Sequence, residues 1–255
     1  MVSQLEFAAG HHLIRLACPD YGGGFLPGQF VNLKCDDTPW GRLYRPFSVL
    51  GYDVKRHEIE IYYHAAGSGT RWLAARPEGT GLKILLPLGK GFTVPEGARK
   101  VALVAGGVGN APLIFLARKL RETRPEVRVE FFMGARKKEA LCIPLFEREK
   151  MAPKYSTDDG SFGHHGSVVD LLANCLENEN LDYVACCGPT PMMAAVQRTA
   201  AGRVAGEASL EERMACGIGA CFGCVATVVD EDGTEKRITT CRNGPVIPLD
   251  RVRFG

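Results

Sequence analysis

The spacing of four cysteines near the C-terminal end constrains this chain more than any other feature. They are Cys216, Cys221, Cys224 and Cys241, which follow the pattern C-x4-C-x2-C with the fourth cysteine after a longer gap. Plant-type [2Fe–2S] clusters use this spacing, because one tight loop supplies three thiolates and a later segment supplies the fourth. Interleaved glycines let the loop turn and direct backbone N–H groups at the sulfur atoms. The pattern predicts an iron–sulfur centre that passes single electrons between two other redox groups.

Two other uses of these cysteines serve as alternatives. Four thiolates also suit tetrahedral zinc, which would make the chain a non-catalytic, zinc-stapled scaffold. Zinc ribbons usually pair two C-x2-C knuckles, whereas here Cys221 and Cys224 form a single one. A disulfide framework is disfavoured because the other six cysteines are scattered among apolar segments, as reduced thiols are. Those six are Cys18, Cys35, Cys142, Cys175, Cys186 and Cys187.

Composition excludes several classes of protein. A length of 255 residues allows two or three small domains, and the net charge of +2 has both signs interspersed. No basic block marks a nucleic-acid surface. No apolar run approaches the ~20 residues that cross a bilayer, and residues 1–6 lack the start of a signal peptide. We therefore expect a cytoplasmic protein that binds neither nucleic acid nor membranes.

The rhythm of apolar residues divides the chain into three segments. Residues 1–96 read as short strands broken by Gly and Pro, which predicts an antiparallel β-barrel. Residues 97–205 alternate apolar strands with helices, which predicts a parallel sheet covered on both faces. Residues 206–255 carry the cysteine loop and a hairpin turned at Asp232-Gly233. The expected strands are 29–33, 45–50, 58–64, 82–86, 101–105, 127–133, 181–187, 225–229 and 236–240, and the clearest helix is 111–122.

A first binding motif lies on a barrel strand and reads Arg45-Pro46-Phe47-Ser48. The planar fork of an arginine suits a pyrophosphate, and a serine hydroxyl can bond the edge of a flavin ring. Strand alternation places Arg45 and Phe47 on one face and Ser48 on the other. Taken alone, the tetrapeptide also fits an edge strand with a surface charge.

A second motif follows at the end of a later strand. Two tyrosines there can stack on an aromatic ring, and the Gly-x-Gly-Thr turn after them places Thr70 as a helix N-cap. Free N–H groups at a helix start favour a phosphate. The plainer interpretation is a helix cap beside core tyrosines, but the two motifs together predict FAD on the barrel. The candidate residues are Tyr62, Tyr63, His64, Gly67, Gly69 and Thr70.

A third motif directly follows the strand expected at 101–105. Its glycines allow close approach of the backbone, and Pro112 fits a first helical turn, so a pyrophosphate can lie there. A partner motif, Cys187-Gly188-Pro189, lies at the carboxyl end of a later strand of the same sheet, where ligands of such sheets bind. Between them, Asp158 can accept hydrogen bonds from a ribose diol and would repel a 2′-phosphate, which favours NAD over NADP. Cys187 is either close to the nicotinamide or a buried strand-end residue. The glycine motif comprises Gly106, Gly107, Gly109, Ala111 and Pro112.

In this order the motifs resemble the ferredoxin–NADP reductase superfamily over nearly the whole chain. More narrowly, the chain resembles the electron-transfer subunits of NAD-dependent, class B dihydroorotate dehydrogenases. The segment Glu212–Gly219, the C-terminal position of the cysteines and the ending Cys241-x-x-Gly-Pro-Val246 carry this narrower likeness. The resemblance implies a barrel for FAD, an α/β domain for NAD and a C-terminal [2Fe–2S] module.

The resemblance also implies an electron relay. A partner subunit with its own FMN would oxidise dihydroorotate, in a heterotetramer with two copies of each chain. Electrons would then cross singly through the [2Fe–2S] cluster to FAD, which would deliver a hydride to NAD⁺, while the protein supplies orientation and electrostatics. Rival functions with the same three modules are an NADH-dependent ferredoxin, sulfide or hydrogenase reductase subunit and an oxygenase reductase.

Overall fold

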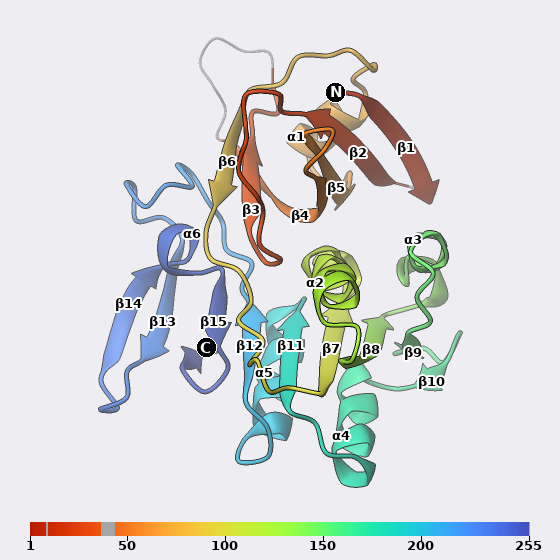
Figure 1. Ribbon diagram of the computed structural model, residues 1–255, viewed down its shortest axis with the longest axis vertical. Coiled ribbons are helices and arrows are strands. Elements are labelled where there is room, and N and C mark those ends of the chain that lie inside the picture. The colour runs from red at the N-terminus through yellow and green to blue at the C-terminus, as the bar shows by residue number, and fades with distance from the viewer. Residues whose placement is uncertain (9, 37–43, 255) are drawn as a thin grey trace.

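In the computed structural model, which describes residues 1–8, 10–36 and 44–254, the N-terminal part forms the expected β-barrel (Figure 1). Its six strands are all antiparallel and follow the spatial order β1-β2-β5-β4-β3-β6. The sheet curls around fully buried side chains such as Val31, Val49 and Ile61. The strands are β1 (Ser3–Ala8), β2 (His11–Ala17), β3 (Phe30–Leu33), β4 (Arg45–Asp53), β5 (Glu58–His64) and β6 (Ile84–Leu88).

A second sheet of seven strands has the order β10-β9-β8-β7-β11-β12-β15. Neighbouring strands in this sheet run parallel, except that β12 and β15 are antiparallel. Its central strand carries only apolar residues and glycine after Lys100, and all of them are buried, as expected where helices cover both faces of a sheet. The strands are β7 (Lys100–Gly106), β8 (Arg128–Ala135), β9 (Lys154–Thr157), β10 (His164–His165), β11 (Tyr183–Cys187), β12 (Gly206–Ser209) and β15 (Val246–Pro248).

Helices cover the two faces of this sheet. Helix α2 lies between the sheet and the barrel (Figure 1), and α4 and α5 pack side by side on the opposite face. The start of α4 is fixed by a capping box, in which Ser167 Oγ accepts from the N–H of Val169 and Asp170 accepts from the N–H of Ser167. The helices are α1 (Ser68–Ala74), α2 (Asn110–Thr123), α3 (Ile143–Arg148), α4 (Val168–Asn178), α5 (Thr190–Ala200) and α6 (Thr240–Asn243), with 3₁₀ turns at Gly107–Gly109 and Lys138–Ala140.

A third, smaller sheet contains the expected hairpin. Its antiparallel order is β14-β13-β16, with β13 (Val225–Val229), β14 (Glu235–Thr239) and β16 (Val252–Arg253). The division at residues 96 and 205 stays a prediction. At the second boundary β12 and β15, both within residues 206–255, are strands of the seven-stranded sheet. Among the described residues, no helix combines the length and the apolarity that a membrane crossing requires.

Candidate functional site

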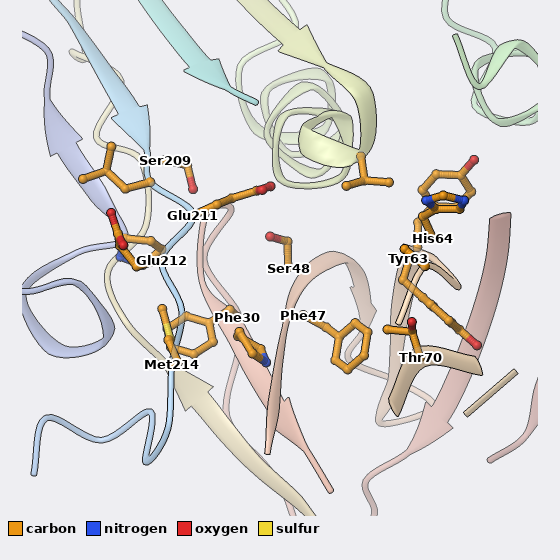
Figure 2. Close-up of a pocket in the computed structure, with 16 residues that line it drawn as sticks. Phe30, Phe47, Ser48, Tyr63, His64, Thr70, Ser209, Glu211, Glu212 and Met214 are labelled. Carbon is orange, nitrogen blue, oxygen red and sulfur yellow. The ribbon is translucent and has the colours of Figure 1, made fainter. Parts of the chain in front are cut away.

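A cavity of about 380 Å³ opens where the barrel, the seven-stranded sheet and the cysteine-bearing segment meet (Figure 2). Each of the three parts of the chain supplies some of its lining, so the cavity exists only in the assembled fold. The lining residues are Phe30, Pro46, Phe47, Ser48, Tyr62, Tyr63, His64, Ala66 and Thr70 from the barrel, Val108 from the turn after β7, and Ser209, Leu210, Glu211, Glu212, Met214 and Pro245 from the C-terminal part.

The barrel wall of the cavity is aromatic, with a hydroxyl at its centre. Phe47 is buried and meets Tyr63 edge to face, with 5.5 Å between the ring centroids. The side chain of Ser48 extends from β4 into the cavity (Figure 2). Large apolar faces with a few placed polar groups are typical of cofactor sites. This wall therefore suits a planar ring system with hydrogen-bonding edges.

Arg45 lies beside the first turn of α1. A Cβ added to Gly69 would be 3.3 Å from Arg45 Nε. The absence of a side chain at Gly69 therefore leaves room for the arginine side chain. The expectation that Thr70 is the N-cap is wrong, because the N-cap of α1 is Gly67 and Thr70 is the third helical residue. Thr70 Oγ1 accepts from the N–H of Gly67 at 3.0 Å and its hydroxyl donates to the Gly67 carbonyl. A cation beside a helix start suits a phosphate-bearing group.

The two loops of the nucleotide motifs pack directly against each other. A Cβ on Gly109 would lie 2.4 Å from the carbonyl oxygen of Cys187, and one on Gly106 would lie 2.7 Å from Pro189 Cδ. The glycines are therefore required for loop packing at the carboxyl edge of the sheet. Gly107, with φ of +57° and no atom near its added Cβ, faces open space instead. Ala111 and Pro112 lie in the first turn of α2, as expected.

Cys187 and Asp158 lie away from the cavity wall. The thiol of Cys187 is fully buried, and burial raises its pKa well above the usual value. Of the two interpretations of this residue, the structure agrees with a buried strand-end residue. Asp158 follows β9 at the same edge of the sheet, is exposed, and its N–H donates to the Ala135 carbonyl at 3.1 Å.

The four cysteines come together as two pairs. The N–H of Cys221 donates to Cys216 Sγ at 3.4 Å, and the N–H of Cys241 donates to Cys224 Sγ at 3.4 Å. Cys224 and Cys241 are buried, whereas Cys216 is half-buried and Cys221 is exposed. One pair therefore faces inward and the other faces the surface.

These cysteines fit a two-iron cluster. Backbone N–H groups of Ile218 and neighbouring loop residues lower the pKa of Cys216 to about 6, which favours the thiolate that iron requires. Burial raises the pKa of Cys241 to about 12, so a bound cation is needed to displace its proton. The pairing of Cys216 with Cys221 and of Cys224 with Cys241 suits a cluster in which each of two iron atoms takes two thiolates.

Several residues that line the cavity were not predicted from the sequence, and Glu211 is the most informative of them. Its carboxylate extends into the cavity across from Ser48 (Figure 2). Glu211 is exposed as a residue, yet the protein around its carboxyl group restricts its hydration and raises its pKa. The available signal was positional, because Glu211 follows a strand at the carboxyl edge of a parallel sheet.

Comparison with known proteins gives concordant similarities. Residues 211–253 match the family described as the iron–sulfur cluster binding domain of dihydroorotate dehydrogenase B. The chain is 35% identical over 247 residues to the dihydroorotate dehydrogenase B (NAD(+)) electron transfer subunit of Desulforamulus reducens, covering 96% of this chain and 93% of that one. It is 40% identical over 230 residues to a homolog of this electron transfer subunit from Aquifex aeolicus, covering 89% of this chain and 85% of that one.

Solved structures show the same fold. An NADH-dependent reduced ferredoxin-NADP oxidoreductase structure, described for flavin-based electron bifurcation, superposes with a TM-score of 0.85. It is 26% identical and the match covers 99% of this chain and 88% of that one. Phthalate dioxygenase reductase gives a TM-score of 0.64 at 21% identity, over 94% and 75% of the two chains. On the strength of the curated relatives, this chain belongs to the family of dihydroorotate dehydrogenase B electron transfer subunits.

Proposed function

We propose that this chain accepts single electrons from a partner subunit at its four cysteines and delivers them as hydride to NAD⁺ from the cavity. Family membership confirms the expected class, an electron-transfer oxidoreductase subunit with FAD, a [2Fe–2S] cluster and NAD. A bound cluster exchanges one electron at a time and a bound flavin one or two, so together they convert single-electron transfer into hydride transfer. The observation that carries the proposal is the cavity itself, whose lining comes from all three parts of the chain.

Each part of the chain has a separate task in this proposal. Arg45 and the Gly67–Thr70 turn hold the diphosphate of FAD, because they place a cation beside a helix start. Pro46, Phe47, Ser48 and the strand Tyr62–His64 hold and orient its ring system. The carboxyl edge of the seven-stranded sheet holds NAD⁺. There Gly107 leaves room for a phosphate, and Asp158 accepts from the ribose hydroxyls.

The partner docks at the outer pair of cysteines. Beside this pair, Phe222 is 71% exposed and Ile218 is 57% exposed, so two neighbouring apolar side chains offer a surface that a partner can cover. We propose that the partner is an FMN-containing catalytic subunit that oxidises dihydroorotate, in a heterotetramer with two copies of each chain. Dihydroorotate supplies two electrons and two protons. NAD⁺ takes both electrons and one proton as hydride, and the second proton goes to solvent.

The decisive experiment is purification of this chain with its native partner, followed by a dihydroorotate–NAD⁺ assay. We expect NADH to form in step with orotate in the complex and not with either subunit alone. A complex that reduces NAD⁺ with a different donor and ignores dihydroorotate contradicts the proposed substrate. The alternative is an NADH-dependent ferredoxin reductase subunit, which is supported by the TM-score of 0.85 to an NADH-dependent reduced ferredoxin-NADP oxidoreductase. Reduction of ferredoxin by NADH, at a rate exceeding orotate formation, would identify it.

A further inference from the structure

The side chain of Phe30 contacts both halves of the proposed relay. It is 3% exposed and packs against the inner cysteine pair, Cys224 and Cys241, in a small apolar cluster. The same side chain lines the cavity, and its residue pairs with Ser48 across strands β3 and β4. Phe30 therefore occupies the space between the sulfur atoms and the flavin site.

Met214 completes this contact from the other side of the cavity. It is half-buried, packs in the same apolar cluster as Phe30, and lies two residues before Cys216. Figure 2 shows the two side chains close together at the end of the cavity nearest the cysteine segment. The space between the inner cysteines and the cavity is thus lined by apolar, closely packed atoms.

A second residue of β3, Asn32, holds the cysteine loop next to the barrel. Asn32 lies two residues from Phe30, so the two side chains share a face of the strand. Asn32 is fully buried and its Nδ2 donates to the Cys216 carbonyl at 3.5 Å. A Cβ on Gly217 would lie 1.8 Å from this amide nitrogen, so the contact requires glycine there. One face of β3 therefore contacts both cysteine pairs.

We propose that Phe30 is the bridge through which electrons pass between the [2Fe–2S] cluster and FAD, and that Asn32 positions the cysteine loop for this passage. This inference rests on the proposed function. Electron tunnelling falls off more slowly through packed atoms than through a void, and protein interiors are packed like organic crystals. One electron leaves the cluster and one arrives at the flavin in each event. Phe30 itself is neither oxidised nor reduced.

The test uses the anaerobic full chain loaded with both cofactors and mixed rapidly with NADH. The first phase is reduction of the flavin by NADH, and loss of flavin absorbance gives its rate. The second phase is electron transfer from the flavin to the cluster, and growth of the reduced-cluster signal in freeze-quenched samples gives its rate. Phe30→Leu keeps an apolar side chain but leaves a small void. We expect it to slow the second phase several-fold more than the first, with iron content and both reduction potentials at wild-type values. The control Phe25→Leu, in the barrel core away from the cysteines, should leave both phases as in wild type.

Other outcomes separate this inference from the proposed function. An unchanged second phase in Phe30→Leu, or equal slowing of both phases, overturns the bridge. If Phe30→Leu loses iron, Met214→Ala decides, because it opens a void beside Phe30. Selective slowing of the second phase there supports the bridge, and wild-type rates overturn it. A wild-type chain whose flavin is reduced by NADH while its cluster never is overturns the proposed function and the bridge with it. Asn32→Leu should lower the cluster content and shift the cluster's reduction potential. Asn32→Ser should cause a smaller loss of cluster and a smaller shift of the potential.

Discussion

Arg118 of helix α2 and Glu149, the residue after helix α3, form a fork-to-fork ion pair, with Nε and Nη2 of the arginine each 2.5 Å from a carboxylate oxygen. The remaining nitrogen, Nη1, donates at 2.8 Å to Glu60 of barrel strand β5, and Arg148 contacts Glu60 as well. The network therefore joins the barrel to helix α2 and the turn after α3. A Cβ on Gly51 would lie 2.3 Å from Arg118 Nη1, so this position admits no side chain without a shift.

Removing Arg118 should destabilise the whole protein. In Arg118→Met, Glu60 and Glu149 keep Arg148 but lose the central cation, and breaking a buried pair in this way costs about 3 kcal/mol. Chemical denaturation checks the free energy of unfolding. The matched control is Arg99→Met. The Arg99 side chain is 73% exposed and its Nη1 lies 3.7 Å from Glu126 Oε1, so the expected loss is under about 1 kcal/mol. Equal losses of unfolding free energy in the two variants would contradict a stabilising role of the Arg118 network.

The same network predicts a dependence of stability on pH. Burial alone would raise the pKa of Glu60, but the charges and hydrogen bonds of Arg118 and Arg148 outweigh burial and lower it from 4.5. A lowered pKa stabilises the fold above the unfolded value and loses this contribution as the pH falls through the folded value. We expect the free energy of unfolding to decline as pH drops below 4.5, and to decline less steeply in Glu60→Gln. Parallel pH profiles would refute this assignment.

Loss of one outer cysteine should uncouple the relay. In Cys221→Ala the cluster loses a ligand, so transfer from the partner should disappear, whereas NADH oxidation with an artificial acceptor should persist because the flavin site is separate. Absorbance and both assays check this outcome. Cys175→Ala, which removes a buried thiol that is no cluster ligand, is the control and should keep both activities. Equal loss of both activities with FAD still bound would mean that the proposed order of carriers is wrong.

Arg45 should determine how tightly FAD is held. Arg45→Ala removes a charge-assisted partner of the diphosphate, which is worth about 1.5–3 kcal/mol and hence at least about a tenfold rise in the dissociation constant. Titration of apoprotein with FAD, followed by flavin fluorescence, measures it. Arg56→Ala is the control, since its side chain is 68% exposed and pairs with Asp53. An unchanged dissociation constant in Arg45→Ala would remove the arginine from the site.

Asp158 should select NADH over NADPH. Asp158→Ser removes the charge that repels a 2′-phosphate, and we expect the NADPH to NADH ratio of kcat/KM to rise about tenfold, equivalent to about 1.4 kcal/mol. Steady-state assays with both nucleotides and an artificial acceptor measure the ratio. Asp250→Ser, on an exposed turn before β16, should leave it unaltered. A ratio that stays constant in Asp158→Ser would exclude this carboxylate as the selecting group.

Local sequence patterns predicted much of this architecture because each element carries its own periodicity. Strand β5 has the expected bounds, and α2 starts one residue before and ends one residue after the expected helix. The helix stops at Thr123 because Pro125 disfavours a helical conformation in the residue before it. The cysteine pairs were predictable as a group because their spacing is itself the signal.

Other features depend on contacts between distant residues and leave no local trace. Strand β15 returns from the cysteine segment to pair with β12. A strand of only three residues carries too little sequence pattern to predict this pairing. Phe30 and Asn32 gain their role from a loop more than 180 residues away. The error at Thr70 is different, because Gly67 competes for the N-cap and tolerates that position nearly as well.

The most direct measurement is iron analysis combined with electron paramagnetic resonance of anaerobically purified protein before and after dithionite. We expect two iron atoms per chain and, on reduction, the signal of a one-electron-reduced [2Fe–2S] cluster that is absent from Cys221→Ala. Stoichiometric zinc with no iron, or a reduced protein that shows no cluster signal, would contradict it.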